Sequence, residues 1–182
     1  RIVAALGLKA FSILPQLQKG RSARVDSLVE CTFFSVLPMR WGAAAVKLSF
    51  LPVTPPKPAT PPQSEATRFA DDVCARVSHS PLTWTLRVQP FVSEAQTPIE
   101  DPTVAWTSEW TDVADIVIPV QDPRSAQGQA LGAQVESFSF DPWHAPVEFR
   151  PLGNMLRARN HAYRLSVLER GAAPEPDGSE GL

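Results

Sequence analysis

Long apolar runs and a strong charge of either sign are both missing from this 182-residue sequence. No uninterrupted apolar stretch reaches the ~18 residues that a membrane-spanning helix needs. Charged residues make up 20% of the chain, yet the net charge is only -2. This charge balance gives no reason to expect nucleic acid or an anionic membrane as a partner. The composition therefore predicts a soluble globular protein without either partner, and we expect it in the cytoplasm.

Cysteine is scarce as well, with Cys31 and Cys74 far apart and no second pair. This spacing fits neither a zinc site nor a disulfide framework. The sequence also has no glycine-rich phosphate loop, no zinc-type cluster and no pair of carboxylates at helical spacing. We expect the two cysteines to be buried thiols in a reducing compartment.

Proline, in contrast, is abundant, with 19 residues in the chain. This is about twice the average share of ~5% and favours edge strands and long loops over a helical bundle. The densest run, "TPPKPATPPQ" at 54–63, is predicted to be a long surface loop.

The spacing of apolar residues predicts helices and strands that do not alternate regularly. Val46, Leu48 and Phe50 alternate as in a strand, and Gly171 marks the end of a helix that begins near Pro151. Helices are predicted over 2–14, 64–80 and 151–170, and strands over 45–53, 82–92, 112–120 and 135–142. This order indicates an α+β fold with antiparallel strand pairing.

Four strands of this length leave two unpaired sheet edges, and a closed barrel needs more strands. The chain begins at Arg1 with a segment that is already apolar, and Lys9 interrupts that segment before any signal-peptide cleavage site. We therefore expect an interior portion of a longer protein. Residues 1–170 are predicted to form one domain, and the polar residues 171–182 a disordered tail.

Tyr163, the only tyrosine, lies four residues after Arg159 and seven before Arg170 in the last predicted helix. These three positions fall within ~40° of each other around a helix of 3.6 residues per turn and so share one face. A guanidinium within hydrogen-bond reach favours the phenolate, which is a good ligand for ferric iron. A half-buried tyrosine beside two solvated arginines is also common in ordinary amphipathic helices, so the spacing alone leaves both interpretations open.

The residues around this face resemble the proximal-helix motif of haem catalases, which is Met-Leu, two residues, Arg, three residues and Tyr. Here the motif is Met155-Leu156, Arg159 and Tyr163. Three upstream segments resemble catalase segments in the same order: "VKLSF" (46–50), "DPTVAW" (101–106) and "SFSFDP" (137–142). The longer stretches look most like the small, divergent catalase-like proteins of bacteria, of which this sequence resembles a C-terminal fragment.

The resemblance implies the C-terminal part of an antiparallel β-barrel with flanking helices and a C-terminal proximal helix that binds b-type haem. By position, Tyr163 would be the axial ligand of the haem iron, Arg159 would hydrogen-bond its phenolate, and Arg170 would pair with a haem propionate. The implied function is a peroxide-decomposing oxidoreductase of the catalase or peroxidase type. Its substrate would be hydrogen peroxide or an organic peroxide, and a homo-oligomer is compatible with the resemblance.

The family also uses a distal histidine and an asparagine from its N-terminal half, and no residue here can be assigned to either role. His79 falls at a predicted helix end, His144 in the approach to the last helix, and His161 on the face opposite Tyr163. We therefore expect the chain alone to be inactive. Two alternatives remain open: a haem-binding protein without turnover, and a haem-free barrel module used for binding or assembly.

Overall fold

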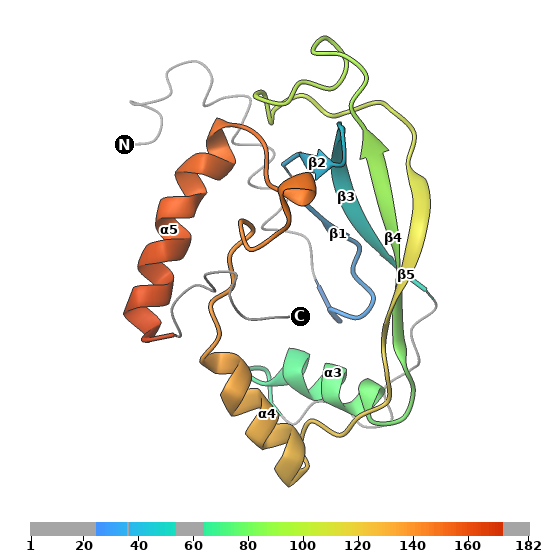
Figure 1. Cartoon of the computed structure of the whole chain (residues 1–182). Coiled ribbons are helices and arrows are strands. Elements are labelled where there is room, and N and C mark those ends of the chain that lie inside the picture. Colours follow the sequence, from blue (N-terminus) through green and yellow to red (C-terminus); the bar gives the residue numbers. More distant parts are fainter. Residues whose placement is uncertain (1–24, 36, 54–63, 173–182) are drawn as a thin grey trace.

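The structure is a computed structural model that describes residues 25–35, 37–53 and 64–172. The predicted helix over 2–14, the proline-rich loop at 54–63 and the tail beyond 172 lie outside these residues. The elements, in chain order, are β1 (Phe33–Phe34), β2 (Met39–Trp41), β3 (Ala44–Pro52), α3 (Arg68–Val77), β4 (Leu82–Pro90), β5 (Thr111–Ile118), α4 (Ala126–Glu136), the short 3-10 helix η2 (Val147–Phe149) and α5 (Asn154–Arg170) (Figure 1).

Most of the predicted elements are present. The strands predicted over 45–53, 82–92 and 112–120 are β3, β4 and β5, and the helices predicted over 64–80 and 151–170 are α3 and α5. The predicted helix end is also confirmed, since Gly171 adopts a left-handed conformation at φ 60°. None of the helices in the described ranges is long and apolar enough to cross a membrane.

All strands of the sheet pair antiparallel, in the order β1-β3-β4-β5, and β2 also pairs with β3. The longest ladder joins β3 to β4, from Val46 opposite Pro90 to Pro52 opposite Trp84. The β2–β3 hairpin turns at Gly42, whose φ of 62° suits a two-residue turn and favours glycine.

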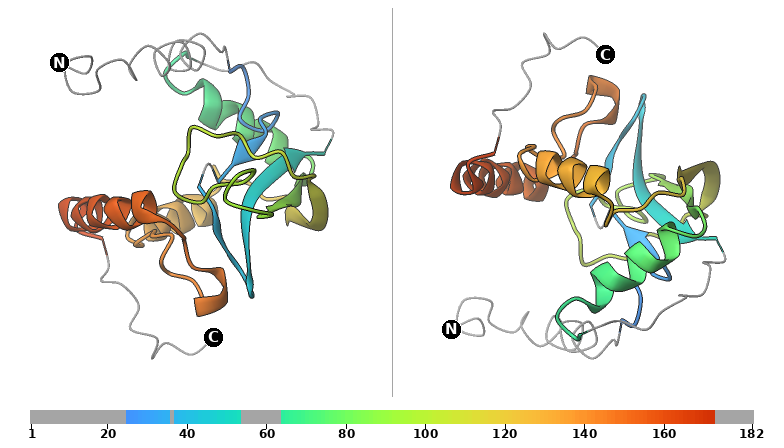
Figure 2. Two further views of the ribbon diagram at one scale, coloured as in Figure 1. Left: turned by 90° about the horizontal axis from the view of Figure 1, so that it is seen from above. Right: turned by 90° about the horizontal axis from the view of Figure 1, so that it is seen from below.

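The sheet is open in the part of the chain that the structure describes. β5 lies at one edge, and every residue of this strand is exposed. The antiparallel α+β arrangement is therefore confirmed, whereas a closed barrel is not. In both Figures 1 and 2 the strands form one curved layer, and α5 lies to one side of it.

One strand prediction is wrong, namely that over 135–142. Residues 126–136 form α4 instead, and residues 137–141 belong to no strand. Ser125 caps this helix, because its Oγ accepts the backbone N–H of Gly128. Phe138 and Phe140 alternate as strand residues would, but both are exposed and no strand lies beside them among the described residues.

The cysteine prediction also needs correction. Cys31 and Cys74 are free thiols, as expected, but both side chains are only partly buried. Cys31 lies in an irregular segment that packs beside α3, where its Sγ is 3.1 Å from the carbonyl oxygen of Ser27. An irregular segment of this kind gives no periodic signal from which burial can be predicted.

A small apolar core joins α3 to the sheet. Val29, Val77 and Leu82 are buried together, with Val73 and Trp84 packed against them. Val73 and Val77 belong to the apolar face of α3, and Trp84 belongs to β4. This core holds α3 across one end of the sheet (Figure 1).

A buried ionic cluster reinforces the same junction. Arg76 Nε donates to Asp72 Oδ1, and Arg76 Nη2 donates to Glu30, both at 2.8 Å. Ser27 Oγ donates to the other carboxylate oxygen of Asp72. The side chains of Arg76 and Asp72 are only 4% and 9% exposed, so each charge depends on its partner.

Replacing Asp72 should therefore be strongly destabilising. We expect Asp72→Ala to lower the free energy of unfolding by about 3 kcal/mol, because the buried Arg76 guanidinium loses its buried carboxylate partner. Urea denaturation followed by far-ultraviolet circular dichroism measures this loss.

The matched control is Glu65→Ala. Glu65 forms an ion pair with Arg68 in the first turn of α3, but its side chain is 88% exposed. We expect a loss below about 0.5 kcal/mol for this exposed pair. Equal losses in the two variants would contradict a structural role for the buried cluster.

Candidate functional site

The candidate site lies on α5, whose position is set by the chain segment just before it. This segment runs beside β2, where Arg40 N donates to Arg150 O at 2.9 Å and Leu152 N donates to Pro38 O at 3.1 Å. Backbone hydrogen bonds therefore attach the start of α5 to the sheet, independently of the side chains in the helix itself.

The first turn of α5 is held by a carboxylate from a distant loop. Glu100 Oε2 accepts the backbone N–H of Asn154 at 2.9 Å, and Arg157 Nη2 lies 3.9 Å from the same carboxylate. A negative charge at a helix N-terminus is favourable. Gly153, at φ 87°, makes the turn into the helix. Sequence reasoning missed Glu100 because it is 54 residues from its partner.

The central feature of α5 is the contact between Arg159 and Tyr163. Arg159 Nη2 donates to the phenol oxygen of Tyr163 at 2.9 Å, and the guanidinium carbon lies 5.5 Å from the centroid of the ring. Tyr163 is half-buried, whereas Arg159 is exposed. The spacing of four residues thus brings the two side chains together as expected.

The phenol borders an open depression of about 220 Å³, lined by Arg159, Ala162, Tyr163 and Ser166. Ala162 and Ser166 are small, so they leave one side of the Tyr163 ring accessible. A flat group could approach the phenol oxygen here while the Arg159 hydrogen bond stays in place.

Arg170 shares the helix face but makes a different contact. Its Nη2 lies 3.4 Å from the carbonyl oxygen of Phe138, in the segment between α4 and η2. Seven residues separate Arg170 from Tyr163, which corresponds to about 10 Å along the helix axis. The structure therefore places Arg170 on the predicted face, near the opposite end of the helix from Glu100.

The three histidines have other surroundings. His79 Nδ1 lies 2.9 Å from Ala75 O at the end of α3, and the backbone N–H of His144 donates to Asp141 O in a turn. His161 is exposed on α5. The described residues contain no cluster of three or more His, Cys, Asp or Glu side chains that could hold a metal ion.

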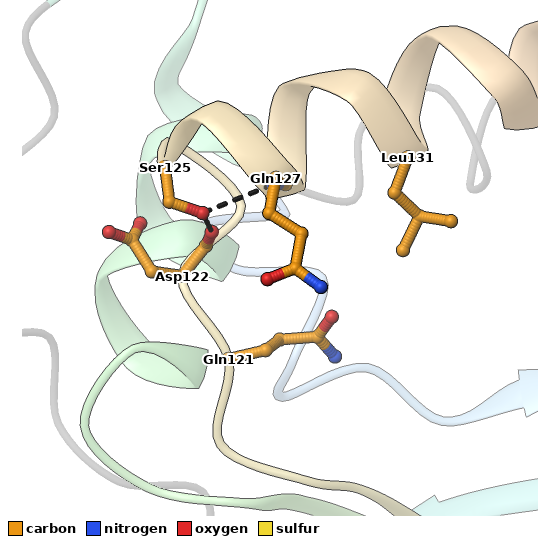
Figure 3. A pocket seen from close by; sticks show the side chains of 6 residues that line it. Gln121, Asp122, Ser125, Gln127 and Leu131 are labelled. Atoms are coloured by element: carbon orange, nitrogen blue, oxygen red, sulfur yellow. Dashed lines mark hydrogen bonds between the residues drawn. The ribbon is translucent and has the colours of Figure 1, made fainter.

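A second depression, of about 240 Å³, lies at the start of α4, where sequence analysis predicted no helix. Figure 3 shows that Ser125 and Asp122 are already linked there, because Ser125 Oγ donates to Asp122 O and accepts from Gly128 N. Gln121 and Gln127 also line it and are exposed. The polar atoms of Ser125 therefore already form hydrogen bonds at the start of α4.

Comparison with solved structures shows that catalases have a similar fold. A bacterial catalase matches 86% of this chain at 18% sequence identity with a TM-score of 0.64. A fungal catalase matches 80% at 17% identity with a TM-score of 0.58. These matches cover 36% and 32% of the catalase chains, so this chain spans about a third of their length.

At these identities the likeness shows the fold alone, and it confirms the expected catalase-like fold. No protein-family model matches the sequence, and no curated protein sequence matches it. The roles of Tyr163, Arg159 and Arg170 remain predictions.

Removing the carboxylate at the start of α5 should loosen this helix. We expect Glu100→Ala to lower the free energy of unfolding by about 1 kcal/mol, because Asn154 N–H loses its acceptor. Hydrogen exchange should also become faster at the first residues of α5.

Glu94→Ala is the control, since Glu94 is an exposed acid in the same connection between β4 and β5. It should leave both the unfolding free energy and the exchange of α5 unchanged. Unchanged exchange in Glu100→Ala would show that the carboxylate does not hold the helix.

Proposed function

We propose that this chain is the haem-binding portion of a peroxide-decomposing oxidoreductase of the catalase or peroxidase type, in which Tyr163 is the axial ligand of the haem iron. The hydrogen bond from Arg159 to the Tyr163 oxygen, on an accessible helix face within a catalase-like fold, is the observation that supports this proposal.

The residues present fit a tyrosinate-ligated haem. A tyrosine ligand must lose its proton, and a guanidinium that donates to the phenol oxygen favours the negatively charged form. Arg159 is already at hydrogen-bonding distance. Ala162 and Ser166, both small, line the open depression beside the phenol, so the oxygen can be approached from that side.

Arg170 is the proposed partner of a haem propionate. Its contact with Phe138 O is long, at 3.4 Å, and the side chain is exposed, so exchanging this carbonyl for a carboxylate requires little rearrangement. A planar guanidinium suits such a carboxylate because it can donate two parallel hydrogen bonds. The phenol and the propionate-binding charge would then lie about 10 Å apart along one helix.

Bound haem would supply the iron at which peroxide is decomposed. The chain would hold the iron through Tyr163, and Arg159 would fix the direction of the ligating oxygen through its hydrogen bond. We assign transfer of the peroxide proton to none of the three histidines, because His79 contacts the end of α3, His144 lies in a turn before η2, and His161 is exposed on the helix that carries the proposed ligand itself.

A haem-binding role without turnover is the second candidate. The same placement of His79, His144 and His161 favours it for the chain on its own. Both candidates require Tyr163, and they differ only in whether peroxide is decomposed.

The axial-ligand assignment is tested by the absorption spectrum of the haem-reconstituted chain. We expect a ferric high-spin spectrum of the tyrosinate type, and loss of this spectrum in Tyr163→Phe because phenylalanine has no oxygen for the iron. His161→Phe is the matched control on the same helix, since it removes the histidine nearest to Tyr163 in the sequence, and it should leave the spectrum unchanged. A wild-type spectrum in Tyr163→Phe would show that the assignment is wrong.

Peroxide turnover separates the two candidates. We expect oxygen release from hydrogen peroxide by the haem-reconstituted 182-residue chain to stay within about twofold of free haem, because a positioned acid/base contributes roughly 10²–10⁴-fold and none is assigned here. Oxygen-electrode measurements at equal haem concentration test this expectation. Rapid oxygen release would favour the enzyme. It would contradict the expectation that the chain lacks a positioned acid/base.

A further inference from the structure

A separate hollow lies on the sheet, away from the phenol of α5. It has a volume of about 260 Å³ and is bordered by Phe34, Lys47, Gln89, Trp106 and Trp110. Lys47 and Gln89 are direct partners in the β3–β4 ladder, so their side chains project from the same face of the sheet. The aromatic residues come from β1 and from the loop before β5.

The walls of this hollow are firmly held. Gln89 is only 6% exposed, and its Nε2 donates to the carbonyl oxygens of Trp106, at 3.1 Å, and Ser108, at 2.7 Å. Trp106 is 7% exposed, and its indole N–H donates to Pro98 O at 3.0 Å. The buried indole therefore has its polar atom satisfied and its orientation fixed before any ligand arrives.

Two aromatic rings form the outer wall. The centroids of Phe34 and Trp110 lie 6.0 Å apart, with the ring planes inclined at 59°. Phe34 is 57% exposed, so this side of the hollow opens to solvent. A ligand with an aromatic ring could enter here and pack against these faces.

The ammonium group of Lys47 lies against an aromatic ring. Its Nζ lies 4.7 Å from the centroid of the Trp106 ring. Within the described residues, no carboxylate lies within salt-bridge distance of this ammonium. Arg87 on the neighbouring strand differs, because it contacts both the Trp110 ring and Asp112. Burial also lowers the pKa of Lys47, as expected for an ammonium that has lost part of its hydration.

We propose that this hollow binds a small aromatic carboxylate, with its ring against Phe34 and Trp110 and its carboxylate on the Lys47 ammonium. A carboxylate would supply the counter-charge that the described residues do not provide, and the indole of Trp106 would remain beneath the ammonium. The volume is slightly below the ~300–1,000 Å³ of drug-sized pockets, which suits a molecule of one or two rings. The proposal does not depend on haem or on α5.

Isothermal titration calorimetry with 1-naphthoate tests this site on the full 182-residue chain. 1-Naphthamide has the same rings without the charge, and acetate has the charge without the rings. We expect naphthoate to bind at least tenfold more tightly than either comparison compound. Equal binding of naphthoate and naphthamide, or no binding of naphthoate at millimolar concentration, would overturn the proposal.

Substitutions at Lys47 and Phe34 separate the charged and the aromatic contributions. Lys47→Gln should weaken naphthoate binding at least tenfold and leave naphthamide binding unchanged, whereas Lys47→Arg should retain most of the naphthoate affinity. Phe34→Ser removes an exposed ring and should weaken both naphthyl ligands. Arg124→Gln, a distant surface charge, is the control and should change neither affinity.

Circular dichroism of each variant confirms that the fold is intact. If a Lys47 variant does not fold, Phe34→Ser still tests the ring contacts, because this side chain is largely exposed. Unchanged naphthoate binding in a folded Lys47→Gln variant would show that the ammonium does not hold the ligand, and unchanged naphthyl binding in Phe34→Ser would show that the ligand lies elsewhere. Either result would overturn the proposal.

Discussion

The antiparallel pairing of β3 with β4 is the interaction on which the rest of the described structure depends. β3 carries β1 and β2 along its other edge, and β4 carries β5. Through β2, the same ladder holds the segment that leads into α5. It also places Lys47 opposite Gln89, and so aligns the ammonium with the amide that fixes Trp106. A one-residue shift in this register would place the two side chains on opposite faces of the sheet.

Arginine or lysine beside an aromatic ring is a recurring arrangement in this chain. Arg68 lies over Phe69, Lys47 over Trp106, Arg87 over Trp110 and Arg159 over Tyr163. Only the last pair also joins the cation to an oxygen on the ring, through the hydrogen bond to the phenol. That oxygen distinguishes Tyr163 chemically, because a phenol oxygen can bind a metal ion, whereas Phe has no polar atom and the Trp ring nitrogen can only donate a hydrogen bond.

Local patterns in the sequence predicted the elements whose side chains alternate or repeat over a full strand or helix. The alternation around Val46, Leu48 and Phe50 gave β3, and the spacing of Phe69, Val73 and Val77 gave α3. The alternation of Phe138 and Phe140 led to a wrong strand prediction over 135–142. This alternation is short and pairs with no strand among the described residues, whereas the preceding residues favour a capped helix. Among the site residues, Arg159 and Tyr163 were predictable because they are four positions apart. The role of Glu100 and the Lys47–Trp106 contact could not be predicted in this way, because only the tertiary structure brings these distant residues together.

The left-handed conformation of Gly153 has a mechanical consequence for the phenol. Tyr163 lies ten residues beyond this glycine, or about 15 Å along the helix axis, so a tilt of roughly 10° at the glycine would displace the phenol by about 2–3 Å. Catalytic groups must be held to within about 0.5 Å of their working position. The helix therefore amplifies small rotations at its start. The position of the Tyr163 oxygen depends on how rigidly the carboxylate of Glu100 and the backbone beside β2 hold the start of α5.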